Sequence, residues 1–351
     1  MKRSWILLVA AAMLLAACDF GGDDNDKPPA PPAALIAKGG DASVTLEWAD
    51  TGAESYNVYF ANEPDITPSN FATLEGGESL VDVRSPLTLD GLENHTGYWF
   101  VVTAIDRGRE SAASPKAAIL PEPPFEPLGG LNDTGVSQCL DGGTLVACPV
   151  DASPGQDAEH GRDFLAANEV LEKRGEGAQG FDFTKIAADG SALPMEAEEW
   201  FCVRDNVTGL MWEVKLADSE SFRFAYHLFG YAENMLCGDT TGCTPTGFIE
   251  ELNERGLCGA NDWRLPSRSE LLSIYDYGQP MPAPDDTLFN APGVSEVEGG
   301  MLSSFWTGDP LLQGGSGLVT HWTVTAGGFS TPVGGNLQNH VRAVRNAHSA
   351  E

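Results

Sequence analysis

The chain of 351 residues carries 20 Lys and Arg against 51 Asp and Glu, a formal net charge of −31 at pH 7. A protein that binds nucleic acid needs a basic face to neutralise phosphates, so this balance excludes that class of partner. Hydrophobic residues make up 42% of the chain, enough apolar surface to exclude wholesale disorder. At about 100 to 200 residues per domain, the length predicts two domains.

The N-terminal segment has the pattern of an export signal. Lys2 and Arg3 are followed by an apolar stretch that ends at Ala17, and this stretch is shorter than the about 20 residues that a membrane-spanning helix needs. Residues 1–17 are therefore predicted to be a signal peptide. Small residues then precede Cys18, which resembles the lipobox of bacterial lipoproteins.

The lipobox resemblance implies that Cys18 is lipidated, so that the chain is exported and anchored to a membrane of the bacterial cell envelope. The domains expected in the rest of the chain favour the outer membrane or the cell surface as the site of anchoring. Asp19 resembles an inner-membrane retention signal, which leaves the inner membrane, facing the periplasm, open. Residues 18–32 are acidic and end in a proline cluster, so we expect a disordered tether.

Residues 33–120 contain only strand and turn patterns. Apolar residues alternate with polar ones from Val44 to Trp48, from Tyr56 to Phe60 and from Tyr98 to Ala104, which is the period of strands with one buried face. This spacing predicts an antiparallel, all-β sandwich. Trp48, and Leu92 placed six residues before Tyr98, resemble the core tryptophan and tyrosine corner of a fibronectin type III domain, which implies a spacer or interaction module. Residues 121–127 are rich in proline, and we expect them to be a hinge.

The domain predicted for residues 128–351 holds six cysteines, an even number that favours disulfides in an exported chain. They are Cys139, Cys148, Cys202, Cys237, Cys243 and Cys258. Fifteen pairings are possible. The preferred set is Cys139–Cys148 and Cys237–Cys243, which close short loops, together with Cys202–Cys258. Zinc binding is a weak alternative, because no Cys-x-x-Cys occurs and the histidines are scattered.

Two helices are predicted in this domain. Thr246 is expected to cap the first, which ends at Gly256. Ser267 and Glu270 form a capping box for the second, whose apolar side continues through Tyr275 before Gly278 ends it. Short strands are expected at residues 305–306, 321–324 and 340–345. Together these elements predict an α+β domain of the C-type-lectin-like kind with disulfides, so the whole chain is expected to be multidomain.

Sequence stretches in this domain resemble the Lcl C-terminal domain family of exported bacterial proteins. The resemblance rests on residues 202–213, residues 256–266, Glu270 with Leu271, and residues 341–345. It implies a lectin-like fold and attachment to glycans or matrix, and it supplies no agreed binding residues. A founding member of the family binds polyanionic glycosaminoglycans. The chain after Leu120 has twelve Lys and Arg against thirty-four Asp and Glu, a net charge of −22, which argues against a heparin-like ligand.

Candidate ligand-binding residues are few. Trp306 and Trp322 are candidate platforms for sugar stacking, with core packing as the alternative. Asp157, Glu159 and Asp163 offer oxygen ligands, so calcium is the one cofactor that the sequence suggests, with a solvated acidic face as the alternative. Alternation around Arg264 predicts that Trp263 and Leu265 are buried and that the guanidinium binds carboxylates or carbonyls nearby.

No catalytic motif is found, so we expect no enzyme. Residues 264–270 have a slight resemblance to formylglycine-generating and sulfatase-modifying enzymes, but no reactive cysteine follows Cys258. The function predicted is adhesion or binding of a glycan, matrix component or envelope protein by the second domain. A periplasmic structural or scaffold lipoprotein is the alternative. No feature of the sequence specifies an oligomeric state.

Overall fold

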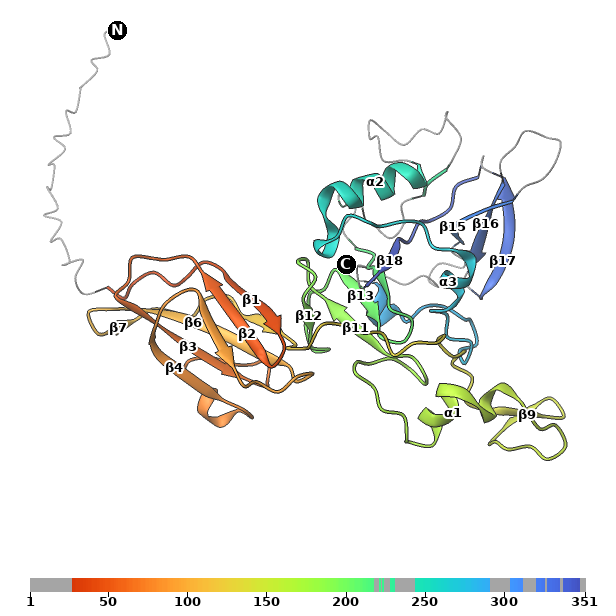
Figure 1. Ribbon diagram of the computed structural model, residues 1–351, viewed down its shortest axis with the longest axis horizontal. Coiled ribbons are helices and arrows are strands. Elements are labelled where there is room, and N and C mark those ends of the chain that lie inside the picture. Colours follow the sequence, from red (N-terminus) through yellow and green to blue (C-terminus); the bar gives the residue numbers. More distant parts are fainter. Residues whose placement is uncertain are drawn as a thin grey trace, which may run out of the picture.

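The computed structural model describes residues 27–217, 221, 223, 228–230, 244–290, 304–311, 320–325, 327–334 and 337–347. The predicted signal peptide, Cys18 with most of the tether, and the predicted Cys237–Cys243 pair lie outside the described residues. Two bodies follow one another along the chain, a β-sandwich and a larger second domain (Figure 1).

The first body consists of two antiparallel sheets. One has the order β1 (Leu35–Gly40), β2 (Ser43–Trp48) and β5 (Leu87–Asp90). The other has the order β4 (Glu78–Val83), β3 (Ser55–Ala61), β6 (Tyr98–Asp106) and β7 (Arg109–Glu110), and β8 (Ala117–Ile119) also pairs with β6. A short 3-10 turn, η2 (Phe71–Thr73), lies between β3 and β4. The predicted sandwich is confirmed.

The core of the sandwich contains the residues that the alternation predicts to be buried. Leu46 and Trp48 are buried, and the Trp48 ring contacts the Tyr56 ring edge-on at 5.5 Å between centroids. The hydroxyl of Tyr98 accepts a hydrogen bond of 3.0 Å from the backbone N–H of Glu93. This is the tyrosine-corner contact that the sequence resemblance implies.

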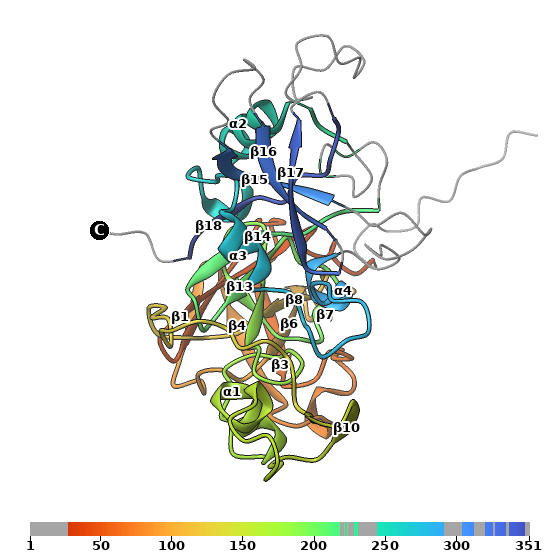
Figure 2. The same ribbon diagram turned by 90° about the vertical axis from the view of Figure 1, so that its right-hand side faces the viewer.

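The described part of the second domain combines two sheets, a hairpin and short helices (Figures 1 and 2). The central sheet is antiparallel and has the order β12 (Ala192–Leu193), β11 (Phe183–Ile186), β13 (Cys202–Asp205), β14 (Leu210–Glu213) and β18 (Val344–Asn346). A second sheet has the order β15 (Ser304–Leu311), β16 (Thr320–Thr325) and β17 (Phe329–Gly334). The hairpin is β9 (Cys139–Asp141) with β10 (Thr144–Val146). The helices are α1 (Gly161–Ala167), α2 (Pro245–Arg255), α3 (Arg268–Leu272) and α4 (Asp286–Phe289), with 3-10 turns η3 (Asp157–Glu159) and η4 (Leu257–Gly259).

Both predicted helices are present, with corrected ends. The N-cap of α2 is Thr244, whose hydroxyl accepts a hydrogen bond from Gly247 N, and not Thr246. The predicted stop at Gly256, which has a left-handed backbone, is confirmed. The capping box of Ser267 and Glu270 is also confirmed, but α3 ends at Leu272 and not near Gly278. Within the described residues no helix is long and apolar enough to cross a bilayer.

Two of the predicted disulfides are present in the structure. The Cys139–Cys148 disulfide joins the first residue of β9 to the chain just after β10 and so closes the hairpin. Cys202–Cys258 ties β13 of the central sheet to the turn that follows α2. This second bridge closes a loop of 56 residues, so it restricts the unfolded chain more than the first, whose residues are 9 apart.

The proline-rich segment predicted to be a hinge is held against the second domain. The carboxylate of Glu122 accepts two hydrogen bonds, of 2.6 and 2.7 Å, from the guanidinium of Arg204 in β13. The same guanidinium lies 4.1 Å from the centroid of the Phe125 ring. Just before this segment, Leu120 N donates to Ala192 O in β12. These contacts join the sandwich to the central sheet of the second domain.

Candidate functional site

Polar residues of the stretch 202–213 stabilise the central sheet. The carboxylate of Asp205 is fully buried and accepts hydrogen bonds from Val207 N and the Thr208 hydroxyl. Burial raises the pKa of Asp205, although these hydrogen bonds oppose the rise. Asn206 is also fully buried and bonds to Thr184 of β11 and to Asp182, which directly precedes that strand. Their hydrogen-bonding capacity is therefore used within the domain.

The environment of Arg264 confirms the prediction in part. Trp263 is buried as expected, but Leu265 is only half-buried. The guanidinium of Arg264 donates to both carboxylate oxygens of Glu270, at 2.8 and 2.6 Å. Burial raises the pKa of Glu270, but the hydrogen bonds from Arg264 and Ser267 outweigh it and the net pKa is lowered. The pair fixes the strand-like stretch to the first turn of α3. Its role is therefore to position this junction.

The second domain also has a buried charged group that the sequence analysis did not single out. Lys215 and Glu213 form an ion pair of 2.8 Å in which both side chains are almost fully buried. Burial lowers the pKa of Lys215 to about 8. Arg342, which lies in the 341–345 stretch, is fully buried and donates to the carbonyls of Glu213 and Phe289. These groups link β14, α4 and the C-terminal segment. Glu213 and Arg342 lie within the stretches 202–213 and 341–345 on which the sequence resemblance rests, whereas Lys215 lies outside them.

The two candidate tryptophans have different environments. Trp306 is fully buried and its indole N–H donates to Phe229 O at 2.8 Å. The proposal that it is a sugar-stacking platform is wrong, because its ring has no exposed face. Trp322 is half-buried, and the guanidinium of Arg268 lies 4.6 Å from its ring centroid. One face of Trp322 is therefore already used by a cation.

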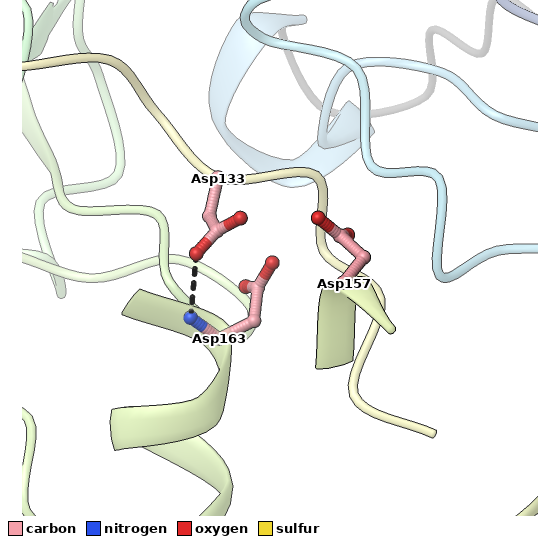
Figure 3. A group of neighbouring side chains, drawn as sticks. All are labelled: Asp133, Asp157 and Asp163. Carbon is pink, nitrogen blue, oxygen red and sulfur yellow. Dashed lines mark hydrogen bonds between the residues drawn. The ribbon is translucent and has the colours of Figure 1, made fainter. Parts of the chain in front are cut away.

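Three carboxylates converge where η3, α1 and the loop before β9 meet (Figure 3). They belong to Asp133, Asp157 and Asp163, and one oxygen of each lies within 4.8 Å of the others. Asp163 is buried and accepts hydrogen bonds from Gly135 N and Gly180 N, while Asp133 accepts one from Asp163 N. The backbone thus fixes the two inner carboxylates.

This arrangement agrees only in part with the calcium site expected from the sequence. Asp157 and Asp163 are brought together, but Glu159 is not, because its carboxylate accepts hydrogen bonds from Gly155 N and Val150 N instead. Asp133 takes its place, and a search for local acidic runs misses it because it lies 24 residues before Asp157 in the chain. A hard cation such as Ca²⁺ binds six to eight oxygen atoms, and the three carboxylates can supply only some of these ligands. Calcium binding therefore stays a prediction.

The electrostatics of the carboxylate group are unfavourable without a counter-charge. Burial raises the pKa of Asp163 to about 6, and repulsion by the neighbouring Asp133 carboxylate adds to the rise. The backbone hydrogen bonds from Gly180 and Gly135 act in the opposite direction. At neutral pH the group thus brings negative charges together, which either protonation or a cation relieves.

Comparisons with known proteins give separate results for the two bodies. No curated protein matches the chain. Similar solved structures include a Fn3-like protein from Clostridium thermocellum, at 26% identity and a TM-score of 0.22, covering 28% of this chain and 98% of that one. The FN5 domain of Drosophila Lar has 17% identity and a TM-score of 0.22, with 26% and 96% covered. The model of the Lcl C-terminal domain family matches residues 201–345. The chain therefore contains a fibronectin type III-like sandwich, recognised by its sheet order and its tyrosine corner, followed by a region that matches the Lcl C-terminal domain family.

Proposed function

We propose that this chain is a non-enzymatic lipoprotein of the bacterial cell envelope that attaches to a glycan, a matrix component or a protein. The second domain, of C-type-lectin-like character, is the attachment module, and the sandwich is its spacer. The pattern of residues 1–17 and Cys18 supports export and anchoring. Two disulfides are consistent with an oxidising compartment outside the cytoplasm.

The observation that carries the proposal is the arrangement of the two bodies. The described chain begins at the end of the sandwich away from the second domain (Figure 1). Arg204, Glu122 and Phe125 then connect the sandwich to the central sheet of the second domain. A lipid at Cys18 would leave the sandwich next to the membrane and the second domain distal to it. Such a geometry suits a module that presents a binding surface to another molecule.

The residues that contact the proposed ligand lie outside the stretches that resemble the Lcl C-terminal domain family. The polar side chains of these stretches form hydrogen bonds within the domain, as shown by Asp205, Asn206, Arg264 and Arg342. The net charge of −22 after Leu120 disfavours a polyanion. A neutral glycan, a cationic partner or a contact bridged by calcium is the class of ligand that we propose.

An attachment experiment tests this function. The processed full chain is applied to arrays of glycans and matrix proteins, and cells with and without its gene are compared for attachment to the positive surfaces. We expect array binding and a loss of attachment that the intact gene restores. Absence of binding on the arrays together with unchanged attachment of the deletion strain would refute the proposal.

Asp19 favours a second candidate function, that of a periplasmic scaffold held at the inner membrane. An Asp19→Ser variant tests it by membrane fractionation. If Asp19 retains the protein, the native chain is found in the inner membrane and the variant moves to the outer membrane. The same outer-membrane location for both chains would eliminate the scaffold hypothesis based on this residue.

A further inference from the structure

A pocket of about 430 Å³ opens in the second domain between the loop before β11 and the segment that joins α3 to α4. Its apolar lining includes Phe181, Phe183 and Ile274, and the two phenylalanine rings are stacked with centroids 5.5 Å apart. The volume is in the range of small-molecule sites in proteins. The position lies beside the carboxylate group, because Gly180 N, next to Phe181, donates to Asp163.

Three carboxylates line the same pocket, those of Asp276, Asp285 and Asp286. Asp276 is held by hydrogen bonds from Gly278 N and the Gln279 amide. Asp285 caps α4 by accepting from Thr287 N at 2.9 Å. The acidic side chains are therefore fixed in position by their own loop, so they do not have to be ordered when a ligand binds.

The charged side chains in the described lining of this pocket are all acidic. Among the residues that the structure describes, no Lys or Arg lines the pocket, and the sequence from 269 to 341 contains neither residue. Other clefts differ in this respect. The cleft beside Trp99 includes Lys116, and the one beside His95 includes Lys173 and Arg174. In the part of the lining that the structure describes, Asp276 and Asp285 therefore have no Lys or Arg beside them, unlike the acidic residues of these two clefts.

We propose that this pocket binds the ammonium or guanidinium group of a Lys or Arg side chain of a protein partner. The aliphatic stem of such a side chain fits the apolar wall, and its cationic head finds the carboxylates and the aromatic rings. The inference rests on the proposed attachment function and specifies the chemistry of its ligand. It makes the attachment target a basic segment of a protein.

A neutral sugar is the competing ligand, and the lining favours it less. Sugar hydroxyls both donate and accept hydrogen bonds, whereas an ammonium or guanidinium group only donates. Each of the three lining carboxylates already accepts hydrogen bonds within the domain but has lone pairs left to accept others. The one side-chain amide of the lining, that of Gln279, already uses one of its two N–H groups on Asp276. A ligand with donors alone therefore matches the side chains of the pocket better.

Binding of small probes to the purified, processed full chain tests the inference. Saturation-transfer NMR titrations use the Nα-acetyl methylamides of lysine and arginine, the same derivative of norleucine as a neutral isostere, and methyl glucoside. We expect the lysine or arginine probe to bind with a Kd of about 1 mM, typical of a single small contact, and to weaken with added salt. Equal binding of norleucine, or binding of the glucoside without the cationic probes, would overturn the inference.

Asp285→Asn removes charge from the pocket with little effect on the fold, since Asn caps helices as well as Asp does. We expect it to weaken the cationic probe about threefold, as for the loss of one partly exposed charge. Asp90→Asn, at the exposed end of β5 in the sandwich, is the matched control and should leave binding unchanged. An equal affinity of the Asp285→Asn variant and the native chain would contradict the assignment of the pocket.

The outcomes separate this inference from the proposed function. If arrays and cells show attachment but the cationic probes do not bind, the attachment function stands and the pocket assignment fails. If the probes bind and Asp285→Asn weakens them, but deletion of the gene leaves attachment unchanged, the pocket assignment stands and the attachment function fails.

Discussion

Replacing Glu122 with Gln tests the connection between the sandwich and the second domain. Glutamine keeps the shape of the side chain but removes the charge that faces Arg204. In the native chain the guanidinium makes two hydrogen bonds of 2.6 and 2.7 Å to the carboxylate. Only 6% of the Arg204 side chain and 17% of the Glu122 side chain are exposed. The change therefore leaves a buried cation without its counter-charge.

The size of the effect follows from this burial. Breaking a buried ion pair by removing one partner costs about 3–5 kcal/mol, and the partial exposure of Glu122 places this case near about 3 kcal/mol. In a cooperative unit of the size of the second domain, each kcal/mol corresponds to about 2–4 °C in Tm. We expect the Glu122→Gln variant to unfold about 6–12 °C below the native chain in differential scanning calorimetry.

A matched control exists in the sandwich. Lys38 and Glu47 form an ion pair of 2.8 Å whose side chains are 51% and 41% exposed. An exposed pair typically contributes about 0.5 kcal/mol, which in a unit of the size of the sandwich corresponds to about 2–4 °C in Tm, so we expect Glu47→Gln to lower the Tm of the sandwich by this amount. Equal losses in the free energy of unfolding for Glu122→Gln and Glu47→Gln would show that the contact with Arg204 is no stronger than an exposed ion pair.

Further predictions concern the disulfides and the carboxylate group. Replacing both Cys202 and Cys258 by Ala should destabilise the second domain by about 4 kcal/mol because of the long loop that they close; a denaturant midpoint like that of the native chain would contradict this. The folded-state pKa of Asp163, about 6, lies above its ordinary value of 3.8. Its protonated form therefore favours the folded state, so stability from this group is present below pH 4 and lost as the pH rises through 6. Asp133→Asn removes the neighbouring charge that adds to this pKa rise, so it should reduce the fall in Tm between pH 4 and pH 7 in metal-free buffer; a fall as large as that of the native chain would refute the repulsion argument.

The sequence predicted the sandwich well because its signal is local. Leu46 and Trp48 alternate with polar residues, and one buried face is enough to determine such a strand. The second domain has fewer local signals. The apolar pattern of α3 continues to Tyr275, yet the helix ends at Leu272. Ser273 N still donates to Ser269 O, and Tyr275 N donates to Leu272 O. The N–H groups of the two residues that follow bond outside the helix, with Asp276 N donating to Ala283 O and Tyr277 N to Thr134 O.

Site residues were predicted only where neighbours in the chain are neighbours in space. Arg264 was expected to bind a carboxylate or carbonyl nearby, and its partner Glu270 lies only six residues further along the chain. Asp133 joins Asp163 from a different loop, so no local pattern identifies it. Trp306 shows a further limit, because alternation does not tell which face of a strand is buried; hydrogen bonding of its indole to Phe229 places it in the core.

Exposure of the second domain on living cells tests the central claim, that it is an attachment module displayed outside the cell. Intact cells and cells with a permeabilised outer membrane are treated with protease, and the second domain is followed by immunoblotting beside a periplasmic marker. The account predicts that the second domain is degraded in intact cells while the marker survives. Protection of the domain until the outer membrane is permeabilised would contradict surface attachment and favour the periplasmic scaffold.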